Sequence, residues 1–272
     1  MGARSPSSYR VSADVFLRAL SLIYLCAFVS LWIQLPGLYK TTGLLPIERI
    51  LSEVRDFEGS HLELWNLLRK NPSLIVLGTA LGYDADAVME VCVLGGALTS
   101  LVAATFVCGS ALISLQYVLY LSVYKVSQTF LSFQWDILLL ETGFAAIFLA
   151  RPLVFARWTR SRPDSKGTDD GADPPLCSLH LVRFILFKLM LSSGVVKIQS
   201  DCPTWLMLTA CHYHFATQCL PTPLAWYFNL FPPILKKVSV AATIWIETAA
   251  PVLILLPFSG VQKLAAVPQI IL

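Results

Sequence analysis

The sequence predicts an all-α membrane protein, a polytopic bundle of about six transmembrane helices with two loops on its outer side. Hydrophobic residues make up 56% of the chain and charged residues only 14%, whereas a soluble domain carries roughly 25% charged residues. So few charges cannot cover a globule of 272 residues. The apolar residues form runs of about 20, the helix length that crosses a ~30 Å hydrocarbon core. A net charge of +3 gives no indication of nucleic-acid binding.

Each predicted span is an apolar run with few charges. Gly109 and Ser110 barely separate the second run from the third, so these two are either a tight helical hairpin or one bent segment. A last apolar run, residues 264–272, is too short to span. It predicts either a fragment or a piece that lies at the membrane interface. The six predicted spans are residues 14–35, 86–106, 109–124, 128–150, 181–199 and 238–258.

Basic residues beside the spans predict the orientation, because cytoplasmic loops retain Lys and Arg. Three arginines against one acid place the N-terminus in the cytosol. A cleaved signal peptide over residues 1–35 is the competing interpretation. The predicted parts are a cytosolic N-terminus (1–13), a first membrane block (14–150) with outer loop 36–85, a flexible cytosolic linker (151–180), and a second membrane block (181–272) with outer loop 200–237.

Five ionisable residues fall inside predicted spans, where each costs at least ~2.5 kcal/mol at the helix centre and needs a partner or a cavity. They are Glu90, Asp136, Glu141, Lys188 and Glu247. Glu141 and Lys188 both fall near the midplane, which allows an ion pair between their helices. Lys197 lies at the outer end of its span, from which its amine can reach the interface. We interpret these charges as contacts between helices; an ion pathway is the alternative.

The outer loop 200–237 holds three cysteines, which predict one disulfide and one remaining thiol. Of the three possible pairings we favour Cys202 with Cys219, because it would join the two ends of the loop. Cys211, His212 and His214 suggest zinc only if the segment is extended, and no fourth ligand is evident. The sequence therefore predicts no metal site and no cofactor.

Several separate motifs carry a resemblance to a known family. They are Gln34-Leu35-Pro36-Gly37-Leu38-Tyr39 with Gly43-Leu44-Leu45-Pro46, Phe133-Gln134-Trp135-Asp136 leading to Leu138-Leu139-Leu140-Glu141-Thr142-Gly143-Phe144, Ser193-Gly194-Val195-Val196-Lys197, and Tyr213-His214 through Pro221-Thr222-Pro223. From about residue 14 to 264 the chain resembles the lipase maturation factor family.

The resemblance implies a multi-pass protein of the endoplasmic reticulum membrane, not an enzyme, that assists the folding, assembly and export of secreted lipases such as lipoprotein lipase. The outer side would then be the lumen, where the client lipase is met. Family members are longer, with a lumenal region that would follow Leu272. Client contacts would use aromatic residues of the outer loops, which could equally be interfacial belt residues. The candidates are Trp65, Trp205, Tyr213 and Trp226.

Two other hypotheses stay open. The stretch from Gly194 to Trp205 is similar to part of vitamin K-dependent γ-glutamyl carboxylase, and this likeness implies an intramembrane enzyme with Lys197 as its base. A transporter would instead use the charged residues inside the spans, Glu90, Asp136, Glu141 and Lys188.

Overall fold

The computed structural model describes residues 9–49, 51, 61–106, 108–151, 174–219 and 222–271. Every regular element in these ranges is a helix, which confirms the predicted all-α class. The chain divides into two compact units, residues 1–179 and 180–272. Within the described residues, four helices are long and apolar enough to cross a membrane. They are α1 (Arg10–Leu38), α5 (Ala85–Thr105), α8 (Leu176–Gln199) and α12 (Pro233–Leu255).

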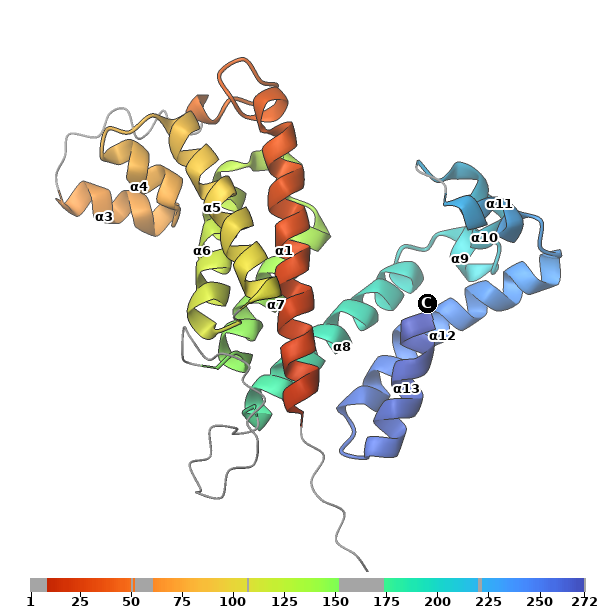
Figure 1. Ribbon diagram of the computed structural model, residues 1–272. Helices are drawn as coiled ribbons and strands as arrows, with labels where there is room; N and C mark the ends of the chain where they lie inside the picture. The colour runs from red at the N-terminus through yellow and green to blue at the C-terminus, as the bar shows by residue number, and fades with distance from the viewer. Residues whose placement is uncertain are drawn as a thin grey trace, which may run out of the picture. The chain divides into compact units, whose positions relative to one another are not determined.

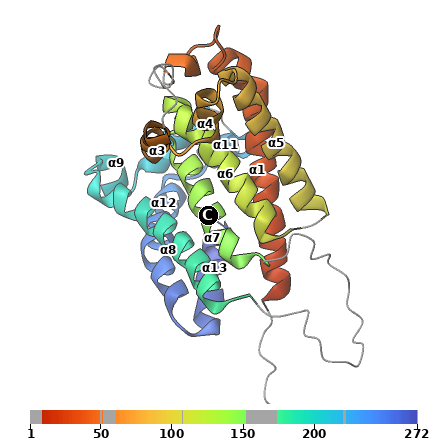
Figure 2. The ribbon, with the colours of Figure 1, turned by 90° about the vertical axis from the view of Figure 1, so that its left-hand side faces the viewer.

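The first unit is a bundle in which α6 (Ser110–Val126) and α7 (Gln134–Leu149) lie beside α1 and α5 (Figures 1 and 2). With 17 and 16 residues, α6 and α7 are each about 25 Å long at ~1.5 Å per residue, near the lower limit for a span. Gly109, in an extended conformation, is the N-cap of α6. The second and third predicted spans are therefore a helical hairpin and not one bent segment.

Aromatic side chains fill the centre of this bundle. The Tyr120 ring lies edge-on to Tyr24 and Phe28, with centroids 5.6 and 5.4 Å apart. Gly96 of α5 faces the Phe28 ring so closely that a Cβ there would overlap it. The missing side chain at Gly96 lets α1 and α5 approach each other closely.

The predicted outer loop 36–85 contains short helices. They are the 3-10 turn η1 (Ile47–Arg49), α3 (His61–Lys70) and α4 (Leu74–Ala80). The Ser73 side chain caps α4 by accepting from the Ile75 N–H and donates to the Ser122 carbonyl of α6 at 2.8 Å. Ile75 and Val76 are buried. The apolar face of α4 therefore holds this helix against the bundle.

The second unit begins within α8 and continues through α9 (Pro203–Leu206), α10 (Ala210–Thr217) and α11 (Pro223–Asn229) to α12 and α13 (Ser259–Ile271). Figure 1 shows α13 turning back along α12. The largest differences from the predicted spans are at three helix starts. α8 begins at Leu176 and α12 at Pro233, each five residues earlier than predicted, and α7 begins at Gln134, six residues later. Pro233 is the first residue of α12. Proline is favoured at this position because a backbone N–H there would have no partner within the helix, so no hydrogen bond is lost. The rest of the predicted linker, residues 152–173, lies outside the described residues.

Candidate functional site

A cluster of polar contacts in the second unit, formed by Ser193, Lys197 and Glu247, lies where α8 meets α12. A Cβ on Gly194 would lie 2.6 Å from the Thr248 Cγ2 and 3.0 Å from the Glu247 Cβ, so only glycine fits this approach. Small residues at a helix crossing allow two helix backbones to approach in this way. The contact brings the last turn of α8 beside the second half of α12.

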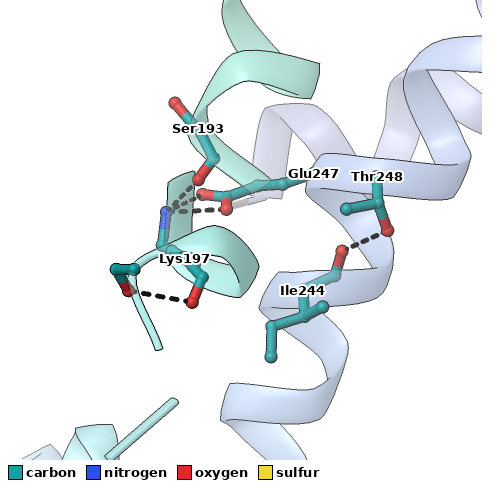
Figure 3. A network of polar contacts seen from close by, with 6 residues as sticks. Ser193, Lys197, Ile244, Glu247 and Thr248 are labelled. Carbon is teal, nitrogen blue, oxygen red and sulfur yellow. Dashed lines mark hydrogen bonds and ion pairs between the residues drawn. The ribbon is translucent and has the colours of Figure 1, made fainter. Parts of the chain in front are cut away.

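Lys197 and Glu247 form an ion pair at this crossing (Figure 3). The Lys197 Nζ donates to both carboxylate oxygens, at 2.8 Å to Oε1 and 2.6 Å to Oε2. It also donates to the Ser193 carbonyl one turn earlier, at 3.3 Å. The side chains are 20% and 9% exposed, so water screens the pair only weakly. The pair links two helices, and its two residues lie 50 positions apart in the chain.

Trp205 of α9 covers the ion pair on one side. The Lys197 Nζ lies 5.2 Å from the centre of the Trp205 ring, within the range of a cation–π contact. The ammonium thus meets a carboxylate, a carbonyl and an aromatic face. These contacts also tie the start of the predicted outer loop to the end of α8.

The geometry bears on the hypothesis that Lys197 is a base. A lysine ammonium has three N–H donors and no acceptor, and the Lys197 Nζ here lies within hydrogen-bond distance of three oxygens, two of Glu247 and one of Ser193. A base needs a free lone pair aimed at its substrate. The observed contacts favour a structural role, in which Lys197 fixes α8 to α12.

Of the other charges singled out from the sequence, Glu90, Asp136 and Glu141 lie in the first unit and Lys188 lies in the second. Glu90 of α5 pairs with Lys40 at 3.1 Å, and both side chains are about one third exposed. Asp136 of α7 is buried and accepts a hydrogen bond of 2.7 Å from the Tyr120 hydroxyl. The sequence analysis did not identify Lys40 and Tyr120 as partners, because it looked for charged residues inside the spans. Lys40 lies outside the predicted spans, and Tyr120 is uncharged.

Glu141 and Lys188 were expected to pair with each other. Glu141 lies on α7 and Lys188 on α8, in different units. Their ion pair stays a prediction.

All seven cysteines are free thiols in the structure. The predicted pairing of Cys202 with Cys219 stays a prediction. The Thr204 hydroxyl, 3.0 Å from the Cys202 Sγ, lowers the pKa of that thiol. Burial raises the pKa of the Cys211 thiol. Cys202 is therefore the more readily ionised of the two.

His212 and His214 lie on helix α10. Residues two apart on a helix are about 200° apart around its axis, so the rings point to opposite sides. The extended segment that a His-x-His zinc site requires is not formed. Among the described residues, no group of three or more His, Cys, Asp or Glu side chains could hold a metal ion.

Comparisons with known proteins cover nearly the whole chain. The family model described as the lipase maturation factor transmembrane domain matches residues 11–272. Lipase maturation factor 2 of Xenopus laevis is 45% identical over 97% of this chain, and the human protein of that name 40% identical over 97%. Lipase maturation factor 1 of Mus musculus is 30% identical over 87%. No solved structure matches the chain.

The matched region is only part of each relative. This chain spans 36% of the Xenopus laevis and human factor 2 proteins and 39% of the mouse factor 1 protein. The family model describes a transmembrane domain and matches well over half of this chain, in agreement with its apolar helices of membrane-spanning length. The chain therefore belongs to the lipase maturation factor family.

Proposed function

We propose that this chain is the membrane portion of an endoplasmic reticulum factor that assists the folding, assembly and export of secreted lipases. The observation that carries the proposal is the match of the family model over residues 11–272, together with relatives named lipase maturation factor 2. In this proposal the N-terminus is cytosolic, and the segments 36–85 and 200–237 lie in the lumen. A lipase of the lipoprotein lipase type is the client.

The contacts of Lys197 support a scaffold that performs no chemistry. Its ammonium is bound on three sides, and the Glu247 side chain is 9% exposed. A substrate would have to displace contacts that hold two helices together. The arrangement suits a rigid membrane support for segments that meet the client.

The test is secretion of active lipoprotein lipase from cells that lack the full-length protein. Restoring the full-length protein should raise lipase activity in the medium at equal lipase synthesis. No rise would contradict the proposal. Expressing residues 1–272 alone beside the full-length protein tells which portion the client requires.

Lys197 variants separate the scaffold from the enzyme hypothesis. Lys197→Arg keeps a cation that can pair with Glu247, but arginine stays protonated and cannot act as a base. A scaffold should keep most of its effect on lipase secretion in this variant, whereas a lysine-based enzyme would lose it. Membrane levels of the variant, measured in the same cells, serve as the control for folding.

A further inference from the structure

The segment that joins α8 to α12 carries no formal charge after Asp201. No Asp, Glu, Lys or Arg occurs between Asp201 and Lys236. In a soluble segment roughly a quarter of the residues would be charged. This composition does not fit a loop that extends into water.

Large apolar side chains cover the outside of this segment. On and beside α9 to α11, seven of them are more than half exposed: Leu206, Met207, Tyr213, Leu224, Trp226, Tyr227 and Leu230. Exposed apolar side chains clustered in this way mark a surface that meets a partner or a membrane.

The helices of the segment are too short to cross a bilayer. α10 has 8 residues and α11 has 7, so each is about 12 Å long or less, against a hydrocarbon core of ~30 Å. The segment follows one membrane-length helix and precedes another. It therefore starts and ends beside the bilayer without crossing it.

The backbone of the segment satisfies much of its own hydrogen bonding, which a non-aqueous location requires. The N–H groups of Trp205, His212 and Ala225 donate to carbonyls within the segment, at 3.1, 2.9 and 3.0 Å. Proline opens both α9 and α11, where no N–H partner is available. Short helices with apolar exteriors suit the membrane interface, where Trp and Tyr are enriched.

We propose that residues 202–219 and 222–235 form an interfacial element whose apolar side chains insert into the leaflet next to the end of α8. The lipid surface fits better than a protein for two reasons. The exposed apolar surface continues onto the flanking membrane helices, at Val196 and Val238. Protein interfaces have a polar rim, and this segment has no charged residue to form one.

Tryptophan quenching tests the proposal in the full-length protein reconstituted in phosphatidylcholine liposomes. The fluorescence lost on Trp226→Phe is the signal of Trp226, and Trp65→Phe gives the matched signal from α3. The two indoles are 64% and 66% exposed, but α3 carries Arg69 and Lys70 in its last turn. Phospholipids brominated near the headgroup should quench most of the Trp226 signal, and bromines deep in the acyl chain should quench less of it.

Acrylamide in the aqueous phase should quench Trp65 and leave most of the Trp226 signal. A second reporter, Leu230→Trp in the Trp226→Phe background, lies four residues on, on the same helical side. It should regain the lipid-quenched signal.

Two outcomes would overturn the proposal. In one, acrylamide quenches Trp226 as strongly as Trp65 and brominated lipids have no effect on it. In the other, Trp226 becomes protected only when lipoprotein lipase is added, which would make this surface a protein-docking site.

Discussion

Replacing Lys197 by methionine would leave the Glu247 carboxylate inside the second unit without its cation. Methionine keeps the apolar stem, so the change removes the charge and three hydrogen bonds with little loss of packing. Removing one partner of a buried ion pair costs ~3–5 kcal/mol. Between membrane helices, single polar contacts average only ~0.6 kcal/mol because the freed group finds other donors. We expect a loss of about 3 kcal/mol, since the Glu247 side chain is 9% exposed.

The assay is unfolding by SDS in mixed micelles, followed by circular dichroism, for wild type, Lys197→Met, Glu247→Leu and the double variant. The double variant replaces the pair by apolar side chains and should recover most of the lost stability. The expected result is a strong coupling between the two positions. If both single variants stay within about 0.5 kcal/mol of wild type, the pair does not hold α8 to α12 and the structural argument is wrong.

Three further predictions concern the Lys40–Glu90 ion pair, the helix crossing at Gly194, and the thiols of Cys202 and Cys211. Lys40→Gln should cost under ~1 kcal/mol in the SDS assay, because its ion pair is about one third exposed; a larger loss would contradict this. Gly194→Leu should cost roughly 1–3 kcal/mol by forcing α8 from α12, while Gly260→Ala, with nothing within 4 Å of its Cβ, should be neutral. As pH rises, iodoacetamide should modify Cys202 at a lower pH than Cys211, because the pKa of Cys202 is lowered and that of Cys211 raised. Peptide mass spectrometry measures the modification of each cysteine, and the reverse order would contradict this prediction.

The apolar runs predicted the membrane helices because hydrocarbon thickness imposes a length that is visible in the sequence. The run Leu74–Ala80 shows where this signal stops. Seven residues are too few for a span, so the sequence placed them in a loop. Their helix forms because Ile75 and Val76 are buried in the first unit and Ser73 bonds to α6. Those contacts depend on tertiary structure, which composition does not contain.

For the ion pair of the candidate site, the sequence predicted that Glu247 needs a partner but did not predict that the partner is Lys197. An acid in the middle of an apolar run identified Glu247 as a residue that needs a partner. Its partner was assigned to the interface instead, because Lys197 lies only two residues before the end of α8. Helical periodicity tells which face a residue is on, but not which helix that face meets. The approach at Gly194 decides this, and it joins segments 50 residues apart.

A scaffold and a catalyst leave different relations between stability and function across the variants proposed above. If α8 and α12 only support the elements that meet a lipase, Gly194→Leu and Lys197→Met should reduce lipase secretion in the order in which they reduce stability. Gly194 carries no functional group, so it can act only through the packing at the helix crossing. Lys197→Arg should fall on the same relation, since it keeps the cation. A Lys197→Arg protein with normal stability and no activity would place chemistry at the amine and exclude the scaffold.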